Sequence, residues 1–412
     1  MRNLTFNERL LIIFKRRECG LTVSQLADQL HMSKSNLSRI ENGKIMVSDE
    51  NEKLLEERFS INFSLGERYL NEYNVVADRI INMLIFYKLF DEYSKDKLEC
   101  THNNVLKSVA YPYFMLIRLF VYSVKNIEHK FVGKYLDVFE RLTPYLDEKH
   151  CRLFYMSKVN FEYFNKNYED AILLCDFIEE NYSHDELLDS YLYHIKAITY
   201  GCLGKKIMTL KTLDEAIFYS MKTNNIVRKI ALNITKANYK RLRGEYKQAL
   251  IIDQETIEYS DGHNVHIYDY ILNRNIAWTY YLLKDYVSAL KYYSIAETYD
   301  IDNDLCFMKA LCSYRLGLRK QCEEYLLRGR RAKNSGVSFP YLLDWLELML
   351  NKRYSKKAEQ KLLYCLRKFK ETMHIDSIKN IYILLIDHYS VHQEWDKVSF
   401  YEEKLTLLLS DD

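Results

Sequence analysis

The feature that most constrains the fold is a pattern that recurs every 33 to 41 residues through most of the chain. A typical copy is RGEYKQA, from Arg243 to Ala249, with a polar turn, a large side chain and then a small residue three positions later. A repeat of this length is one supersecondary unit, which buries its apolar face only by stacking on its neighbours. The large residues that anchor the pattern are Tyr168, Lys206, Tyr246, Tyr286, Arg319, Tyr354 and Trp395.

These segments resemble the tetratricopeptide repeat, in which one helix ends at the polar turn and the next begins after it. With only 11 glycines and 3 prolines, the chain has few helix breakers, which favours an almost entirely helical structure. The resemblance implies an all-α fold of about seven to nine hairpins, stacked into a right-handed TPR-like α-solenoid with a concave inner surface. An alanine stands nine positions before each of four anchors, where its small side chain lets neighbouring helices approach. These alanines are Ala197, Ala237, Ala277 and Ala310.

A second pattern lies near the N-terminus, from Thr22 to Lys44. Apolar residues at i, i+3, i+4 and i+7 from Val23 form one stripe of a short helix. Ser33 stands at an N-cap position, a second short helix follows, and Gly43 supplies its stop signal. The solvent face of this second helix suits the major groove of DNA, because it offers hydrogen-bonding groups and no acid: Lys34, Ser35, Asn36, Ser38 and Arg39.

The segment LSRIENGK, from Leu37 to Lys44, together with Leu26, Ala27 and Ser33, is similar to the Cro/C1-type (XRE) helix-turn-helix family. The resemblance implies a DNA-binding domain over residues 1–63, with base-reading side chains on the second helix and phosphate contacts around it. The DNA contacts that we expect are Arg16, Thr22, Ser24, Lys34, Ser35, Asn36, Ser38, Arg39, Asn42 (through its backbone) and Lys44.

One position departs from that family. His31 stands where the family usually has glycine, at a turn residue that tends to adopt a positive φ. Histidine tolerates this conformation better than a β-branched residue does. We therefore expect a small strain and an intact motif.

The distribution of charge agrees with a DNA-reading N-terminus. The whole chain carries a net charge of only +2, so no global field recruits nucleic acid. Residues 1–45, however, hold eight basic and four acidic side chains, which leaves the rest of the chain slightly acidic. The positive charge is thus concentrated on the segment that should touch phosphate.

No Gly/Ser-rich linker separates the N-terminal segment from the repeats. We place the boundary near Phe63, with a helical-repeat domain for peptide binding and dimerisation over residues 64–412. A helical connection would transmit a change in the shape of the repeats to the DNA-binding domain.

A Cro/C1-type domain followed by tetratricopeptide-like repeats resembles the Rap/Rgg/NprR/PlcR/PrgX (RRNPP) group of peptide-pheromone receptors. The resemblance implies a quorum-sensing transcription regulator in which a short signalling peptide lies extended in the solenoid and changes operator binding. It leaves two alternatives open: a Rap-like protein that binds or dephosphorylates a response regulator of the sporulation phosphorelay, and a DNA-bound scaffold without a peptide. A homodimer is expected, because one helix-turn-helix unit reads only a short half-site.

An extended peptide exposes unpaired N–H and C=O groups, and a side-chain amide can serve both. Taking each anchor as position seventeen of its repeat, positions 2, 5, 9 and 12 of the first helix point inward. Solvation, or pairing within the solenoid, is the alternative for the asparagines and arginines among them. The candidate peptide contacts are Asn160, Tyr163, Asn238, Arg241, Arg274, Trp278, Tyr281, Tyr314, Glu347 and Asp387.

Signatures of catalysis are weak, and we expect neither enzymatic activity nor a cofactor. Gly201 to Lys206 superficially resembles a phosphate loop, but its spacing is short and no Ser or Thr follows. His388 and His392 share one helix face without a third ligand at a fixed spacing. The nine cysteines contain no C-x-x-C pair, and no run approaches eighteen apolar residues. These features predict a reduced, cytoplasmic protein without a membrane segment.

Overall fold

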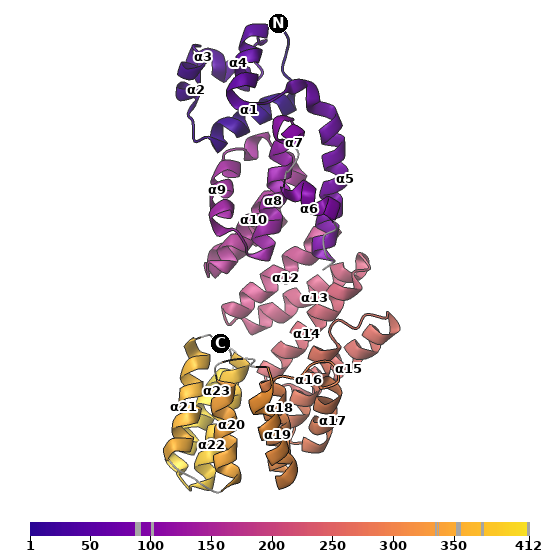
Figure 1. Ribbon diagram of the computed structural model, residues 1–412, viewed down its shortest axis with the longest axis vertical. Coiled ribbons are helices and arrows are strands. Elements are labelled where there is room, and N and C mark those ends of the chain that lie inside the picture. The colour runs from indigo at the N-terminus through magenta and orange to yellow at the C-terminus, as the bar shows by residue number, and fades with distance from the viewer. Residues whose placement is uncertain are drawn as a thin grey trace. The chain divides into compact units, whose positions relative to one another are not determined.

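The computed structural model describes residues 1–86, 92–99, 103–333, 336, 338–351, 356–371 and 375–409. Apart from two isolated β-bridges, the regular elements of these residues are helices, so the predicted all-α fold is confirmed (Figure 1). The chain divides into two units, one formed by residues 1–204 and 211–228 and the other by residues 205–210 and 229–412. Among the described helices, none is long and apolar enough to cross a membrane.

The first unit holds the shorter N-terminal helices and the first hairpins. Its helices are α1 (Phe6–Glu18), α2 (Val23–Gln29), α3 (Lys34–Glu41), α4 (Asp49–Phe59), α5 (Gly66–Ile85), α6 (Glu92–Glu99), α7 (Asn103–Lys107), α8 (Tyr111–Lys125), α9 (His129–Glu140), α10 (Glu148–Phe164), α11 (Tyr168–Asn181) and α12 (Glu186–Cys202). Two helices contribute residues to both units: α13 (Lys206–Lys222) and α14 (Ile226–Leu242).

The second unit continues the succession of paired helices. Its helices are α15 (Tyr246–Gly262), α16 (Asp269–Leu282), α17 (Tyr286–Ala296), α18 (Asn303–Arg315), α19 (Arg319–Arg331), α20 (Phe339–Leu350), α21 (Lys356–Glu371), α22 (Ile375–Val391) and α23 (Trp395–Leu409).

The anchors of the sequence repeat are the first residues of the second helix in each pair. Helices α11, α13, α15, α17, α19 and α23 begin at six of the seven anchors, and Tyr354 lies outside the described residues. The predicted close approach at the alanines is also confirmed, because all four are fully buried. The predicted fold is therefore confirmed: α2 and α3 form the helix-turn-helix, and the TPR-like hairpins run from α10 to α23.

A residue with a positive φ stands two positions before each of these six anchors. Three of these residues are glycines, with φ between 73° and 78° (Gly204, Gly244 and Gly317), and three are not, with φ between 59° and 66° (Lys166, Lys284 and Gln393). A left-handed residue ends the first helix and reverses the chain, so that the second helix packs back on the first. Only glycine adopts this conformation without a steric cost.

Helices α1 to α4 form the N-terminal head, which comprises residues 1–63. Hydroxyl side chains cap its helices: Ser33 accepts a hydrogen bond from the amide of Asn36 at 3.1 Å, and Ser48 accepts one from Asn51 at 3.2 Å. His31 adopts φ 53°, the left-handed conformation expected at the turn between α2 and α3. The predicted turn at His31 and the predicted cap at Ser33 are therefore confirmed.

The core of the head continues into the helices that follow it. The ring of Phe14 on α1 lies 5.4 Å from the ring of Tyr111 and 5.5 Å from that of Phe139. On the same side of α1, Glu18 accepts hydrogen bonds from the hydroxyl groups of Tyr111 at 2.8 Å and Tyr135 at 2.5 Å. One hydrophobic core runs without interruption from α1 into α12. The boundary near residue 63 stays a prediction about the sequence, because the packing continues across it.

The second unit is strongly curved. The ammonium group of the buried Lys379 on α22 donates a hydrogen bond to the backbone carbonyl of Arg241, at the end of α14, at 2.6 Å. Lys206 donates to the carbonyl of Leu408 on α23 at 3.2 Å. The last hairpin of this unit therefore returns to helices at its beginning, and the first helices of its pairs converge on a shared interior.

Candidate functional site

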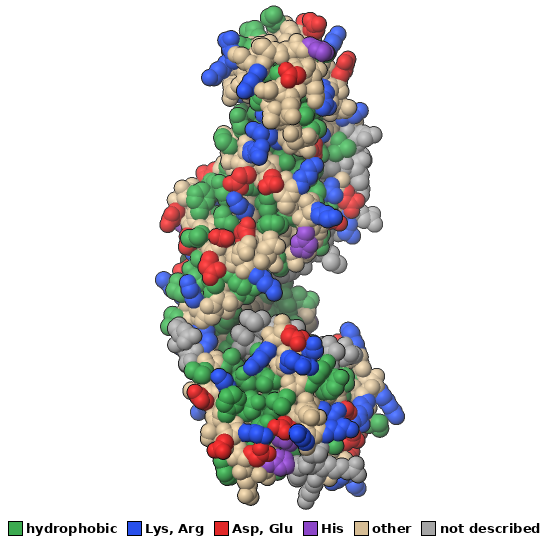
Figure 2. Space-filling view, turned by 90° about the vertical axis from the view of Figure 1, so that its left-hand side faces the viewer, with side chains coloured by type: hydrophobic (Ala, Val, Ile, Leu, Met, Phe, Trp, Pro, Cys, Tyr) green, Lys and Arg blue, Asp and Glu red, His purple; other side chains and the backbone are tan. Residues whose placement is uncertain are grey.

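The face of α3 that was predicted to read DNA is accessible. Leu37 and Ile40 are buried in the head, whereas Lys34, Ser35 and Arg39 are exposed. Asn36 and Ser38 are half-buried on the same helix. The one acid of α3, Glu41, points into the head and leaves no carboxylate on the exposed side. In Figure 2, lysine and arginine side chains lie on the head together with several acidic ones.

Arg16 does not belong to this surface, and its predicted phosphate contact is wrong. Its side chain is only 3% exposed and forms a bidentate ion pair with Glu41, with Nε–Oε1 at 2.6 Å and Nη2–Oε2 at 2.8 Å. It also donates a hydrogen bond to the carbonyl of Leu21 at 3.2 Å. Arg16 therefore ties α1 to α3 and to the turn before α2, which makes it a positioning residue for the recognition helix.

The remaining predicted DNA residues lie around α2 and the end of α3. Thr22 is exposed and caps α2, with its hydroxyl accepting from the amide of Gln25 at 3.2 Å, while Ser24 is half-buried. Asn42 is exposed, but its backbone amide donates to the carbonyl of Ser38 at 3.1 Å. The predicted phosphate contact through that amide is therefore wrong.

Lys44 is exposed just beyond this turn. Close to it, the guanidinium of Arg9 packs on Gly43, where an added Cβ would lie 2.2 Å from its Nη1 atom. Arg9 thus places a further positive charge beside the end of α3. The motif gives no signal for this role of Arg9, because Arg9 and Gly43 are distant along the chain and meet only in the folded head.

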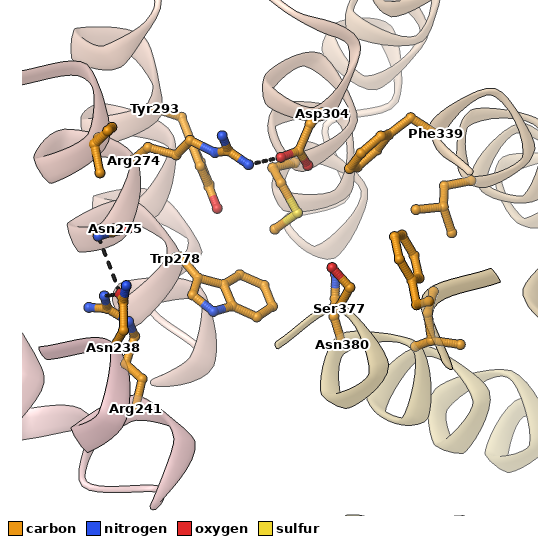
Figure 3. A pocket seen from close by; sticks show the side chains of 15 residues that line it. Asn238, Arg241, Arg274, Asn275, Trp278, Tyr293, Asp304, Phe339, Ser377 and Asn380 are labelled. Atoms are coloured by element: carbon orange, nitrogen blue, oxygen red, sulfur yellow. Dashed lines mark hydrogen bonds and ion pairs between the residues drawn. The ribbon is translucent and has the colours of Figure 1, made fainter. Parts of the chain in front are cut away.

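The second unit contains a cavity of about 270 Å³ between the first helices of successive pairs. Four predicted peptide contacts line it, namely Asn238, Arg241, Arg274 and Trp278. Figure 3 shows Trp278 on α16 pointing across the cavity towards Ser377 and Asn380 on α22. The other lining residues are Ile271, Asn275, Tyr293, Asp304, Met308, Phe339, Leu342, Phe369, Ser377, Asn380 and Ile381.

Two ion pairs build the polar part of the wall. Arg241 is buried, pairs with Asp253 and donates to the hydroxyl of Thr279 at 3.1 Å. Burial raises the pKa of Asp253 to about 6, although Arg241 acts in the opposite direction. Arg274 pairs with Asp304 at the surface of the cavity (Figure 3). Both arginines therefore form ion pairs within the solenoid, which was the alternative to a peptide contact. Of the two, only Arg274 keeps an accessible side chain, which is 38% exposed.

Asparagine amides gather in the cavity. Asn275 donates to Oδ1 of Asn238 at 3.4 Å, and Asn238 also accepts from Arg241. Oδ1 of Asn380 is buried and has no hydrogen-bond partner within the described residues. A buried amide oxygen without a partner is costly in an empty cavity, and a donor from a bound molecule would relieve that cost.

Some of the lining residues that were not predicted follow the same repeat register. Position 2 of successive repeats is Ile271, Asp304, Phe339 and Asn380, and all four line the cavity. Applying position 2 to every repeat would have identified them. Asn275 and Ser377 carry no such signal, because they lie beside the inward stripe.

Asn160 is not an exposed ligand-binding residue. It is fully buried in the first unit, where its amide donates to the carbonyl of Met156 at 2.9 Å and to Ser123 at 3.4 Å. Its oxygen accepts from the hydroxyl group of Tyr191 on α12. The prediction of a peptide contact is wrong, and the alternative, a bond to the adjacent hairpin, is what the structure shows.

The other predicted contacts do not line the cavity. Tyr163 packs against Tyr168 at the turn between α10 and α11, with ring centroids 5.9 Å apart. Tyr281 is buried behind Trp278, and its ring stacks on the indole at 5.3 Å. Three more residues are half-buried elsewhere in the second unit: Tyr314, Glu347, which pairs with Arg330 at 2.7 Å, and Asp387, which pairs with Arg315.

Comparison with known proteins gives a family match for the head and fold matches for the repeats. Residues 12–65 match the HTH_3 helix-turn-helix family. Among curated proteins, no sequence relative is found at a significant level.

The repeats are similar to solved structures of Rap and NprR proteins. The apo form of RapI aligns over 83% of this chain and 96% of its own length, with 15% identity and a TM-score of 0.63. A Rap protein complexed with competence and sporulation factor aligns over 82% and 97%, with 15% identity and a TM-score of 0.58. Apo NprR from B. thuringiensis aligns over 82% and 99%, with 17% identity and a TM-score of 0.58. The chain therefore combines an N-terminal helix-turn-helix domain with the helical-repeat fold of the Rap and NprR structures.

Proposed function

We propose that this chain is a DNA-binding transcription regulator whose second unit senses a short peptide and thereby changes operator binding. The observation that carries the proposal is the acid-free, exposed face of α3 in a chain whose repeats enclose an amide-lined cavity. The fold agrees with this function, because a Rap protein has been solved with competence and sporulation factor, and NprR with its cognate peptide NprX.

DNA recognition rests on the head. Lys34 and Arg39 can donate to guanine O6 and N7 in the major groove, and Asn36 can pair with adenine. Thr22, at the start of α2, and Lys44, just beyond α3, can contact the phosphates of the flanking backbone. Arg9, beside Gly43, adds a further cation for the same backbone. A protein that reads an operator in this way acts in the cytoplasm.

Peptide recognition rests on the cavity. Asparagine amides both donate to and accept from an extended backbone, and Trp278, Phe339 and Phe369 provide apolar contact for a side chain. The volume of about 270 Å³ lies just below the usual range for ligand sites, which is roughly 300–1,000 Å³. The cavity therefore receives one or two peptide side chains, and a longer peptide requires the second unit to open.

The regulator acts as a homodimer in this proposal, because a twofold pair of heads reads two half-sites one helical turn apart. The decisive experiment selects DNA sites for the full chain from a random library, then measures affinity for the selected operator with and without a library of short peptides. Specific DNA binding that a peptide changes at least tenfold supports the proposal. Specific DNA binding that no peptide alters contradicts the sensing role.

The Rap-like alternative predicts a different outcome. RapI shares the fold of the repeats, and a protein of that kind would bind a response regulator. A phosphotransfer assay with phosphorylated response regulators tests it directly. Loss of phosphate that depends on this chain, without specific DNA binding, would favour the alternative over our proposal.

A further inference from the structure

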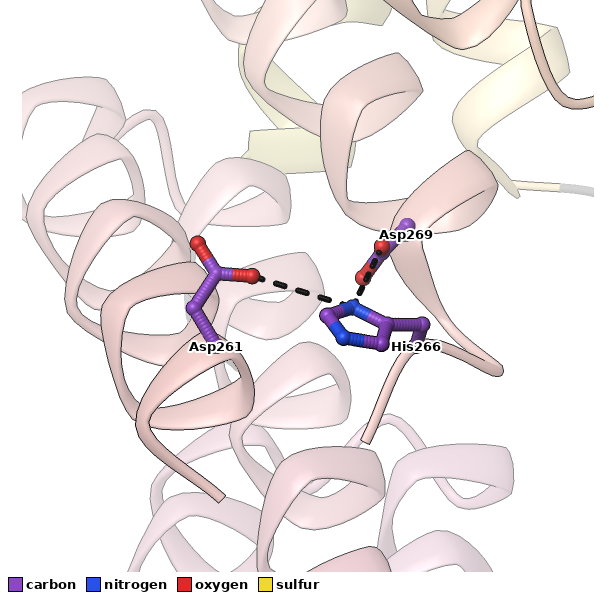
Figure 4. Close-up of side chains that lie close together, drawn as sticks. All are labelled: Asp261, His266 and Asp269. Atoms are coloured by element: carbon purple, nitrogen blue, oxygen red, sulfur yellow. Dashed lines mark hydrogen bonds and ion pairs between the residues drawn. The ribbon is translucent and has the colours of Figure 1, made fainter. Parts of the chain in front are cut away.

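A cluster of two carboxylates and an imidazole joins α15 to α16 outside the cavity (Figure 4). Asp261 lies at the end of α15, Asp269 is the first residue of α16, and His266 lies on the segment that connects them. Both carboxylates point at the same ring nitrogen, with Asp269 Oδ2 at 3.0 Å and Asp261 Oδ1 at 3.8 Å from Nδ1 of His266.

The other ring nitrogen has a partner of its own. Nε2 of His266 lies 3.1 Å from Oδ1 of Asn264, an oxygen that only accepts, so the tautomer with its hydrogen on Nε2 satisfies this contact. In the neutral ring, Nδ1 then presents its lone pair to the two carboxylates. This is the arrangement of a metal-binding histidine, whose second nitrogen donates to an oxygen that fixes the tautomer.

Asp269 is a buried carboxylate whose cationic partner, within the described residues, is His266 when that ring is protonated. Its side chain is only 9% exposed, and within the described residues it pairs with no lysine or arginine. Its remaining hydrogen bond comes from the hydroxyl group of Tyr299 at 3.2 Å. A buried carboxylate without a cation is unfavourable, so a charge between Asp269 and Nδ1 of His266 would stabilise the folded hairpin.

We propose that Asp261, His266 and Asp269 bind a divalent transition-metal ion such as Zn²⁺, Mn²⁺ or Co²⁺. Ligand atoms bonded at about 2.0–2.2 Å to one ion lie roughly 3.0–3.5 Å apart. Asp269 meets this range at 3.0 Å from Nδ1, whereas the exposed Asp261, at 3.8 Å, must move closer, and the three ligand atoms lie within 4.8 Å of one another. A proton on Nδ1 would serve Asp269 only, because Asp261 is too distant for a hydrogen bond. Imidazole among the ligands selects these ions over Mg²⁺ and Ca²⁺, and water completes the shell on the exposed side.

A bound metal ion would cross-link the start of α16 to the end of α15. Helix α16 carries Arg274, Asn275 and Trp278 in the cavity, so the ion would stiffen one wall of it. The ion would also raise the melting temperature, because it binds the folded hairpin and the unfolded chain lacks the assembled ligands. This proposal rests on the geometry of the cluster and stands apart from the peptide-sensing function.

The test uses the full chain, freed of metal by a chelator and titrated with Co²⁺ while its visible absorption is recorded, and with Zn²⁺ by calorimetry. The variants are His266→Gln and Asp261→Asn, and the matched control is His263→Gln in the same connecting segment. Circular dichroism without metal establishes that each variant keeps its helices. Because Asp261 is exposed, Asp261→Asn serves as the test should His266→Gln fail to fold.

The wild type and His263→Gln are expected to bind one equivalent with nitrogen and oxygen ligands and to melt at a higher temperature with metal. His266→Gln and Asp261→Asn should lose at least tenfold in affinity and the metal-dependent rise in melting temperature. Absence of binding by the wild type, equal binding by the variants, or a thiolate-to-cobalt charge-transfer band in place of the expected spectrum would each overturn the proposal.

Discussion

At the scale of single residues, charge alone does not tell which arginines reach DNA. Arg16 and Arg39 are both basic residues of the head, yet Arg16 is buried against Glu41 while Arg39 is exposed on α3. The sequence places both beside the motif, and only the packed head reveals which one has an internal partner. Substitution of Arg16 should therefore lower the stability of the fold, whereas substitution of Arg39 should change base discrimination.

Replacing Arg16 by alanine is expected to lower the stability of the folded chain by about 3 kcal/mol, because it leaves the carboxylate of Glu41 buried without a partner. Thermal unfolding followed by circular dichroism measures the loss. The double variant Arg16→Ala/Glu41→Leu removes both charges and should recover most of the stability. A single variant as stable as the wild type would contradict the structural role of the pair.

Replacing Arg39 by alanine should leave the melting temperature unchanged and reduce discrimination between the operator and a single-base variant by about 1–3 kcal/mol. Fluorescence anisotropy with both duplexes at one salt concentration provides the measurement. An equal loss of affinity for all duplexes would show that Arg39 contacts phosphate instead of a base edge.

His194 makes the first unit sensitive to acid. Burial, with a smaller effect from Arg228, lowers the pKa of His194 to about 3, and its Nδ1 accepts a hydrogen bond from Arg228 at 3.1 Å. The folded state therefore binds this proton more weakly than the unfolded state, whose histidine pKa is about 6.5. The stability that the neutral ring contributes is present above about pH 6.5 and is lost as the pH falls towards 3.

The variant His194→Gln keeps an acceptor for Arg228 and removes the titrating group. Calorimetric melting temperatures between pH 7 and pH 4 should fall less steeply for this variant than for the wild type. Parallel pH profiles for the two proteins would exclude His194 as a source of the acid sensitivity.

At the scale of elements, the helical hairpins could be predicted because their signals are local. An anchor, a turn two residues before it and an alanine on the preceding helix lie within about a dozen residues, and the helices begin where this pattern places them. The inward face was harder to predict. Lys379 donates a hydrogen bond to the carbonyl of Arg241 because the second unit curves back on itself. No local sequence pattern predicts this curvature.

The turns allow a matched test of backbone strain. Gly244→Ala should destabilise the chain by about 1 kcal/mol, because a Cβ is disfavoured at φ 78° although nothing lies within 4 Å of it. Lys284→Gly, at φ 64° in the equivalent turn, should have a smaller or opposite effect, because relief of strain offsets the added freedom of the unfolded chain. Denaturant unfolding measures both variants, and equal destabilisation by the two would show that φ is not the controlling factor.

The cavity leads to a prediction about ligand affinity. Asn380→Ala should weaken binding of an active peptide about tenfold, since the amide would lose hydrogen bonds worth roughly 1–1.5 kcal/mol. Asn181→Ala provides the control, because Asn181 is exposed on α11 and its amide bonds within its own helix. Calorimetric titration with the peptide distinguishes the two, and an unchanged affinity of the Asn380 variant would place the peptide elsewhere.

At the scale of the whole molecule, function is distributed between the two units. The surface that suits DNA lies in the first unit, and the cavity lies in the second. The types of residue at both places could be predicted from motif and register. The division into units could not, because it depends on which helices share a core, and the sequence shows one unbroken series of hairpins from α10 onward.

The packing of α1 on α8 and α9 has a practical consequence. A fragment cut after residue 63 would leave Phe14 and the carboxylate of Glu18 without the tyrosines that cover them. Such a fragment would expose apolar surface to solvent, and it would aggregate or fold only in part. A fragment intended to hold the folded head should therefore extend at least through α9.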